Sequence, residues 1–166
     1  MSLCNNSNII KKATFSALFY VARLLKTAPD IIADEVEPYG CYKMFVNCSN
    51  LKSIDKIDVK KVGNNGFEQM FIGCSSLVNI PSILPATELS KYCYNQMFSD
   101  CTSIVTAPEL PATELYMYCY GSMFKNCTSL TQAPSILPAT TLEYGCYGDM
   151  FSGCTSLVRA PYLPAS

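Results

Sequence analysis

The chain has 166 residues, of which 49% are apolar and 15% are charged, and its net charge is −1 with a pI near 5.4. This apolar content excludes a wholly disordered chain, and the lack of a basic excess argues against a nucleic-acid-binding protein. The chain has no histidine, so the commonest general base and metal ligand is missing.

Residues 1–38 are expected to form an N-terminal helical cap. The apolar residues of the segment follow the spacing of one face of an amphipathic helix: Phe15, Leu18, Phe19, Ala22 and Leu25. Pro29 would end this helix, and the residues from Asp30 to Glu37 leave room for a short second one. A helix placed on the end of a repeat stack would cover its apolar core.

Two other interpretations of this apolar segment stay open. It is also compatible with a helix that binds a partner or a membrane surface. Because Lys11 and Lys12 precede it, the segment further resembles the start of an uncleaved signal peptide. The run is shorter than the roughly 20 residues that a membrane-spanning helix needs, so no membrane span is expected.

A repeat begins near residue 39 and continues through residue 166. The dipeptide Met-Phe recurs at steps of 26 or 27 residues, and a Cys follows the Phe by three residues in every copy. The methionines of these dipeptides are Met44, Met70, Met97, Met123 and Met150. A regular period of this length is typical of stacked repeat proteins, so we expect a solenoid domain of about five coils over residues 39–166.

Each coil is expected to combine a short parallel strand with a short helical turn. The strand would follow the Cys that comes three residues after Phe, which is the second Cys of each repeat. It would end at a proline such as Pro108, which has no amide hydrogen for the ladder. Thr87, Thr113 and Thr140 are suited to cap the helical turns. In the second coil Ile57, Val59 and Val62 alternate with charged residues and predict a further strand. The expected fold is therefore an α/β solenoid, a right-handed, leucine-rich-repeat-like stack.

The cysteines fall into two phases of the repeat, which predicts two buried columns of thiols. One comprises Cys48, Cys74, Cys101, Cys127 and Cys154. The other comprises Cys41, Cys93, Cys119 and Cys146, with Gly66 in the place of a Cys. Small free cysteines suit buried positions, so reduced ladders are favoured over disulfides. Reduced thiols and the lack of a signal peptide favour a cytoplasmic location, with the cell surface as the alternative.

The residue types argue against an enzyme. The Cys spacing differs from that of structural zinc sites, and no histidine is present to generate a catalytic thiolate. We therefore expect no catalytic residue, no metal and no cofactor. A cysteine-dependent enzyme or a metal-binding protein remains the alternative from another functional class.

The string Met-Phe-x-Gly-Cys-Thr-Ser-Leu-x-x-Ala-Pro-x-Leu-Pro-Ala-Thr, most regular over residues 67–166, resembles the BspA-type leucine-rich repeats of bacterial surface proteins and of some phages. Residues 39–66 match it more distantly, and residues 1–38 are not covered. The resemblance implies a parallel-sheet solenoid that is used for adhesion or protein binding.

The expected function is a non-enzymatic protein-binding module. It would be a stand-alone phage- or bacterium-encoded binder or inhibitor of a larger protein machine, or alternatively a fragment of a cell-surface adhesin. The candidate contact residues are outward-facing strand positions and tyrosines of the turns: Asn79, Thr106, Thr131, Gln132, Arg159, Tyr92, Tyr116, Tyr118 and Tyr144.

The sequence also suggests the chemistry of a partner. Residues 67–166 contain three Lys or Arg against seven Asp or Glu, which favours a basic partner surface. The residues from Pro161 to Ser166 break off within a coil. Two interpretations stay open: the open C-terminal edge docks on another molecule, for instance a second copy of the chain, or the chain is a fragment.

Overall fold

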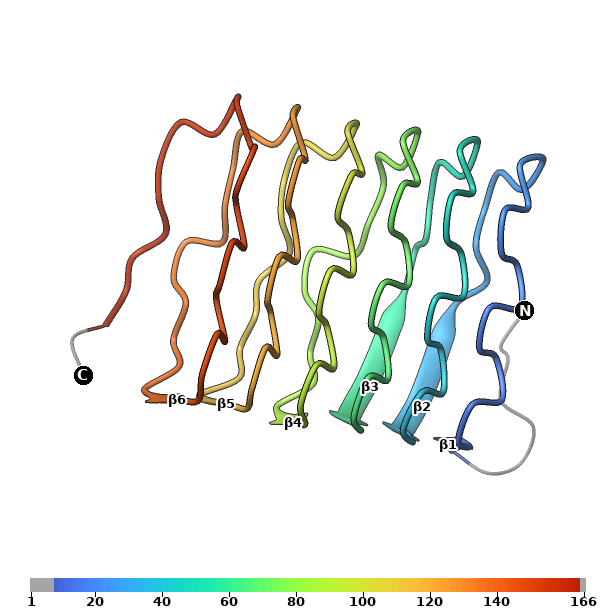
Figure 1. Cartoon of the computed structure of the whole chain (residues 1–166), viewed down its shortest axis with the longest axis horizontal. Coiled ribbons are helices and arrows are strands. Elements are labelled where there is room, and N and C mark those ends of the chain that lie inside the picture. Colours follow the sequence, from blue (N-terminus) through green and yellow to red (C-terminus); the bar gives the residue numbers. More distant parts are fainter. Residues whose placement is uncertain (1–7, 165–166) are drawn as a thin grey trace.

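The computed structural model describes residues 8–164 and shows a stack of six coils that follow one another along the stack in chain order (Figure 1). Each coil begins at a residue with positive φ, and successive starts are 26 or 27 residues apart. We number the coils 1 to 6, and they comprise residues 13–38, 39–64, 65–91, 92–117, 118–144 and 145–164. A stacked-repeat architecture is thereby confirmed.

All strands pair in parallel with strands of neighbouring coils. One sheet has the order β1-β2-β3-β4 and a second contains β5 and β6. Their bounds are Ile9–Ile10, Ile31–Val36, Ile57–Val62, Glu88–Leu89, Glu114–Leu115 and Thr141–Leu142. The six-residue strands β2 and β3 pair from Ile31 with Ile57 to Val36 with Val62. The strand predicted over Ile57 to Val62 is therefore confirmed.

Proline explains why the later strands are short. In coils 3 to 5 the segment before the strand has the form Pro-x-(Ile)-Leu-Pro, as in Pro81 to Pro85. A proline nitrogen cannot donate to a ladder, so pairing is restricted to two residues, as in β4. The predicted helical turns at Thr87, Thr113 and Thr140 are wrong, because these residues lie at or beside the short strands β4 to β6.

The first ten residues of each coil form a series of overlapping turns, which we call the turn ladder. It spans residues 13–22, 39–48, 65–74, 92–101, 118–127 and 145–154. Every fourth residue has positive φ; in coil 2 these are Tyr39, Lys43 and Asn47. Alternate amides close turns, as from Met44 N to Cys41 O at 3.3 Å.

The remaining amides of the turn ladder join the coils. In coil 2 the amide of Phe45 donates to Met70 O at 2.8 Å. Five amides of each turn ladder donate in this way, four to carbonyls of the next coil and the first to the carbonyl just before that coil. The backbone of this segment is thus satisfied half within a coil and half between coils, without a helix or a regular sheet.

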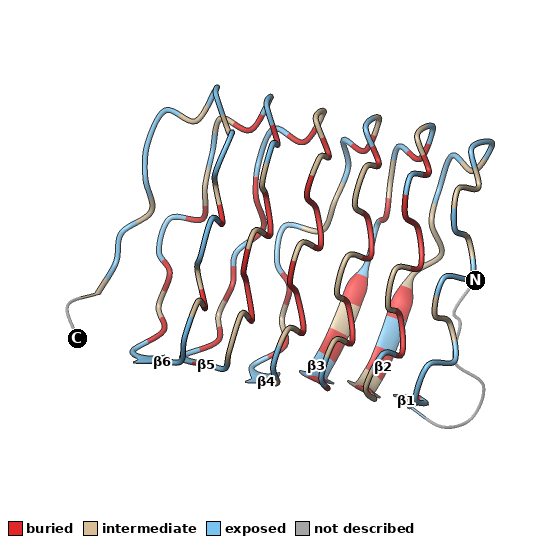
Figure 2. Cartoon of the chain, in the orientation of Figure 1, coloured by how far each residue is buried: buried red, intermediate tan, exposed pale blue. Residues whose placement is uncertain are grey.

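Identical side chains stack in columns inside the turn ladder. The Phe of each repeat contacts the Phe of the next with nearly parallel rings, and centroid distances run from 5.2 Å for Phe45 and Phe71 to 5.9 Å for Phe124 and Phe151. Phe45, Phe71, Phe98 and Phe124 are fully buried, whereas Phe151 at the last coil is only partly buried. Burial is therefore deepest in the middle of the stack, as Figure 2 shows.

The predicted N-terminal helical cap is wrong. Residues 13–38 form coil 1, and no helix occurs among residues 8–164. Phe19 stacks on Phe45 at 5.2 Å, so coil 1 continues the Phe column. The reason for the error is that the turn ladder repeats every four residues. Over ten residues this period gives apolar spacings that resemble the 3.6-residue period of a helix. The stretch from Asp30 to Glu37, expected as a second helix, contains strand β2.

One of the two predicted cysteine columns, that of Cys41, Cys93, Cys119 and Cys146, is also partly wrong. Cys93 and Cys119 lie in successive coils with their sulfurs 3.1 Å apart, and Gly66 holds the same place in coil 3. In coil 2, however, this place belongs to Gly40, because Cys41 lies two residues after the positive-φ residue Tyr39. Cys41 thus shares its phase with Phe67 and Tyr94 rather than with Cys93.

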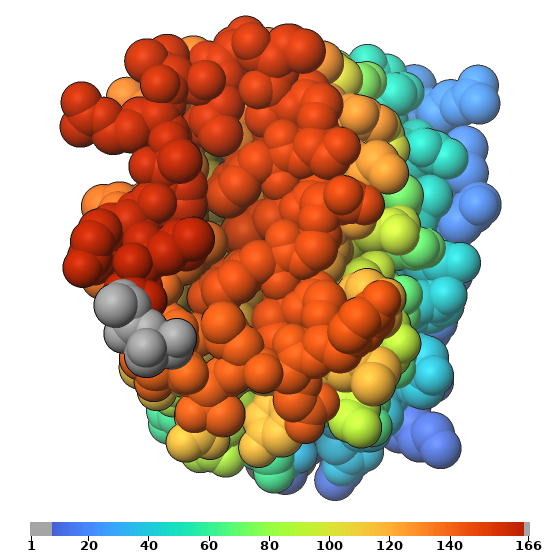
Figure 3. Space-filling model, turned by 60° about the vertical axis from the view of Figure 1, so that its left-hand side comes forward, coloured from blue at the N-terminus to red at the C-terminus, as the bar shows by residue number. Residues whose placement is uncertain are grey.

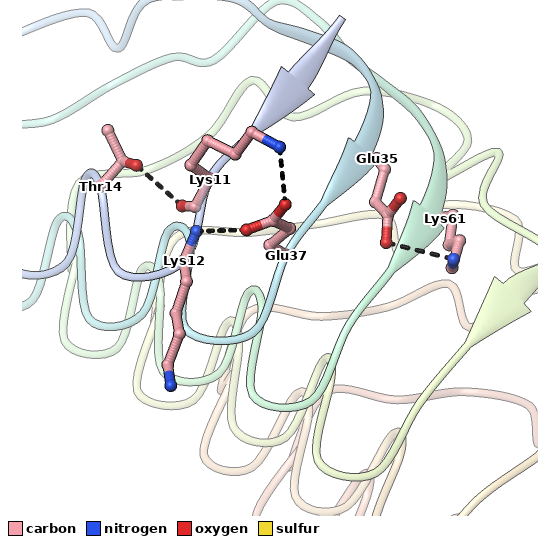
Figure 4. Close-up of polar contacts among 6 residues, drawn as sticks. All are labelled: Lys11, Lys12, Thr14, Glu35, Glu37 and Lys61. Atoms are coloured by element: carbon pink, nitrogen blue, oxygen red, sulfur yellow. Dashed lines mark hydrogen bonds and ion pairs between the residues drawn. The ribbon is translucent and has the colours of Figure 1, made fainter.

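Ion pairs connect the outer edges of the first coils (Figure 4). Lys11 pairs with Glu37 at 2.9 Å, and Lys61 of β3 pairs with Glu35 of β2 at 3.1 Å. The Glu37 carboxylate also accepts a hydrogen bond from the Lys12 amide at 2.8 Å. These pairs are exposed, so each contributes little to stability, but they bring opposite charges of neighbouring coils into contact.

Candidate functional site

One side of the stack carries a ladder of single-residue bridges between coils. It includes the pairs Ser53 with Asn79, Thr106 with Gln132, and Gln132 with Arg159, all parallel. This is where a short strand was expected after the second Cys of each repeat, and the pairing is parallel as predicted but only one residue wide. Because each bridge fixes the backbone, the outward side chains stand in a row along the stack.

Two adjoining hollows follow this row and together form what we call the groove. The larger hollow, about 650 Å³, is lined by Thr106, Thr131, Gln132 and Arg159 among others. The smaller, about 460 Å³, is lined by Asn79 and, like the first, by Thr106, Ala107 and Glu109. All five strand-position residues singled out from the sequence therefore line one or the other of these two adjoining hollows, which together extend across coils 3 to 6.

The surface of the groove is amphipathic. The apolar side chains that line it are exposed to 51% at Val78, 45% at Val105 and 85% at Val158. Polar contacts tie neighbouring coils together along it: Thr106 Oγ1 donates to Gln132 Oε1 at 3.4 Å, and the Ser135 amide donates to Glu109 Oε1 at 3.3 Å. Exposed apolar side chains beside ordered polar ones are typical of surfaces that bind proteins.

The groove also contains residues that sequence reasoning missed. Glu109, Pro134 and Ser135 also line the larger hollow. Their signal in the sequence is their position within three residues of Thr106 and Gln132. Glu109 is held there by a parallel bridge with Ile83 of the preceding coil, a contact that the Met-Phe spacing alone does not reveal.

Three of the four predicted tyrosines, Tyr92, Tyr118 and Tyr144, form a separate cluster. Tyr118 stacks on Tyr92 at 5.4 Å and meets Tyr144 edge-on at 5.4 Å. The hydrogen bond between the Tyr118 and Tyr144 side chains raises the pKa of Tyr118. Tyr116 lines small hollows with Lys61 and other residues, and these share no residue with the groove. The two groups of predicted contact residues are thus two surfaces and not one.

A glycine makes room for the Tyr118 ring. Gly145 has φ of 69°, and a Cβ placed on it would lie 2.6 Å from Tyr118 Cε1. Any larger residue would therefore displace this ring, and an L-residue would in addition be strained at that φ.

The other cysteine column is a ladder of thiol donors, and it comprises Cys48, Cys74, Cys101, Cys127 and Cys154. Each thiol donates to the carbonyl of the Phe of the preceding coil, at 3.0 Å from Cys101 Sγ to Phe71 O and at 3.1 Å from Cys127 Sγ to Phe98 O. Burial raises the pKa of Cys101 and of Cys127. At neutral pH these side chains are therefore neutral thiols, the unreactive form of cysteine.

Among residues 8–164, no group of three or more Cys, Asp or Glu side chains is arranged to hold a metal ion. Nor does this part of the chain contain a helix of the length and apolarity that a membrane crossing requires. Comparison of the chain with protein-family models, with curated proteins and with solved structures found no match.

Proposed function

We propose that the chain is a non-enzymatic protein-binding module and that the groove is its contact surface. The observation that carries this proposal is that Asn79, Thr106, Thr131, Gln132 and Arg159 line two adjoining hollows, and that parallel bridges join Thr106, Gln132 and Arg159 in three successive coils. Buried positions of the repeat, such as those of the Phe and Cys columns, keep the same residue type in successive coils. The outward positions differ instead, with an amide at Asn79, a hydroxyl at Thr106 and a guanidinium at Arg159. A rigid backbone that presents different side chains suits selective recognition of one partner.

The groove supports a protein partner better than a small molecule. It is open along its length, and its exposed valines provide apolar area without an enclosed cavity. Residues 67–166 carry an excess of acidic side chains, which favours a partner with a basic surface. In this proposal the protein is a stand-alone binder or inhibitor from a bacterium or a phage, in line with its resemblance to BspA-type repeats.

The test is affinity capture from an extract of the source organism, with quantitative mass spectrometry of the retained proteins. The groove variant is Thr106→Arg combined with Gln132→Arg, which adds bulk and positive charge at two exposed positions. The matched control is Thr128→Arg combined with Ser129→Arg, at exposed positions of the same repeat outside the groove.

We expect the wild type and the control to retain the same partner, and the groove variant to lose it. A third variant, Tyr116→Ala with Tyr144→Ala, tests the predicted tyrosines. If the groove variant keeps the partner, or if only the tyrosine variant loses it, the groove is not the contact surface.

A further inference from the structure

The two ends of the stack are complementary in their backbone hydrogen-bonding groups. In coils 1 to 5, five amides of each turn ladder donate toward the next coil, four to its carbonyls and one to the carbonyl just before it. In coil 6 the equivalent amides have no acceptor among residues 8–164: Gly145, Tyr147, Asp149, Phe151 and Gly153. Figure 3 shows this end of the stack, with coil 6 in orange and red across a broad face.

Coil 1 presents the matching acceptors at the opposite end. Inside the stack the acceptors are the carbonyls one residue before each amide's counterpart in the next coil, as with Phe45 N and Met70 O. The corresponding carbonyls, one just before coil 1 and four within it, receive no hydrogen bond from residues 8–164: Lys12, Thr14, Ser16, Leu18 and Tyr20. One end thus carries a row of five donors, and the other a row of five acceptors in the same phase.

The side chains at the two ends match in the same register. Phe151 and Phe19 end the Phe column, and both are only partly buried, whereas the rings between them are fully buried. Tyr147 and Phe15 likewise end the neighbouring aromatic column and are partly buried. Placing one end on the other would continue both columns with the ring contacts that already join the coils.

We propose that a second copy of this chain stacks head to tail, with coil 6 of one molecule donating to coil 1 of the next. The new interface repeats the coil-to-coil contact within the chain, five amide bonds and stacked rings included. A contact between two different surfaces that advances along an axis does not close, so the product is a linear assembly. The residues that carry this contact, 145–154 and 12–20, line no part of the groove, so the proposal stands independently of the proposed function.

A charge pair gives the sharpest test of this register. The middle positive-φ residue of each coil forms a column that contains Gln69 and Gln96, whose side chains bond across two coils at 2.8 Å. The terminal members of this column are Ala17 and Asp149, both exposed. In the stacked pair Asp149 of one copy therefore lies beside Ala17 of the next.

Ala17→Lys creates an attractive pair with Asp149, and Ala17→Asp a repulsive one. Both substitutions leave a residue type suited to the site, because Lys43 and Asp149 occupy the same phase with positive φ. By sedimentation velocity across a concentration series, we expect Ala17→Lys to strengthen association and Ala17→Asp to weaken it, each by about two- to fivefold at low salt. Adding Asp149→Lys to Ala17→Asp should restore it.

The wild type should show an average mass that grows with concentration without a fixed stoichiometry. Wild type and Ala17→Lys protein that both stay monomeric at all concentrations would overturn the proposal. Association that ignores the charge at residue 17 would overturn it as well, because a contact between like ends or through the groove does not bring residue 17 beside residue 149. Circular dichroism of each variant confirms that its fold is unchanged.

Discussion

The ring of Phe67 stacks on the ring of Tyr94 with centroids 5.6 Å apart, and the Tyr94 hydroxyl has no hydrogen-bond partner among the described residues. Tyr120 of the next coil stacks on Tyr94, and its hydroxyl also has no hydrogen-bond partner among the described residues. Tyr94 is fully buried, and its burial raises the pKa of its hydroxyl. Phenylalanine and tyrosine therefore occupy equivalent positions of this column. The tyrosine hydroxyl loses its hydrogen bonds to water on burial and gains none in the folded protein.

From this relationship we predict that Tyr94→Phe stabilises the protein. A buried hydroxyl without a partner costs free energy, so its removal should raise the free energy of unfolding by about 1 kcal/mol. Urea denaturation measures the change, and Tyr116→Phe is the control, since Tyr116 is 39% exposed and should show no effect. A loss of stability in Tyr94→Phe would mean that its hydroxyl has a partner.

The Phe column predicts a gradient of stability effects along the stack. Phe98 is fully buried between Phe71 and Phe124, so Phe98→Ala should cost about 3–5 kcal/mol. Phe151 has a ring neighbour on one side only and is partly buried. We expect Phe151→Ala to cost less than half as much in the same denaturation experiment at a dilution that keeps the protein monomeric. Equal costs at the two positions would contradict this arrangement.

Coil 1 contains a strained position. Val21 has φ of 57°, a conformation that a β-branched residue rarely adopts, whereas Asn47 and Asn126 hold the equivalent place in coils 2 and 5. We predict that Val21→Asn raises the free energy of unfolding by about 1 kcal/mol. The matched control is Val46→Asn, which should destabilise, because Val46 is buried and does not have positive φ. A destabilised Val21→Asn protein would place residue 21 in another conformation.

One carboxylate should make stability fall as pH rises. Burial raises the pKa of Glu68 above the ordinary value of 4.5, and its carboxylate accepts a hydrogen bond from the Asn65 side chain. The folded state therefore holds this proton more tightly than the unfolded state, and the resulting stability is lost as pH rises through the folded pKa. Glu68→Gln keeps the acceptor and has no such loss.

The stability advantage of Glu68→Gln over the wild type should consequently grow as pH rises from 4 to 7. Both proteins share the opposite contribution of Asp34 and Glu37, whose pKa values are lowered by hydrogen bonds from Lys60 and Lys11. The comparison cancels that contribution. Thermal unfolding at several pH values measures the difference, and a difference that shrinks with pH would contradict the raised pKa.

Part of this structure could be predicted from the sequence. The Met-Phe spacing predicted the stack, because identical residues at one phase must meet when coils pile up, as Phe98 and Phe124 do. The alternation of Ile57, Val59 and Val62 with charged residues predicted β3, because a strand buries every second side chain. The last two buried residues, Val59 and Val62, are three positions apart instead of two. The row from Asn79 to Arg159 was placed on one face for the same reason.

Other features could not be predicted from propensities. Coil 1 has Leu18 and Ala22 where later coils have Met and Cys, so its membership of the repeat was hidden. The apolar residues of its turn ladder are spaced like those on one face of a helix. The residue types of Ala17 and Lys43 also do not indicate positive φ, since this conformation accompanies hydrogen bonds between coils. The part of the groove that Glu109 lines depends on a second bridge between coils, from Ile83 to Glu109, which follows a proline and was not expected from the sequence.

The central claim is that residues 13–38 are the first of six equivalent coils, and contacts measured by nuclear magnetic resonance test it most directly. We predict nuclear Overhauser effects between the rings of Phe19 and Phe45 and a backbone coupling at Ala17 that corresponds to positive φ. A continuous series of helical contacts between residues three apart over residues 15–25, without contact between Phe19 and Phe45, would contradict the account.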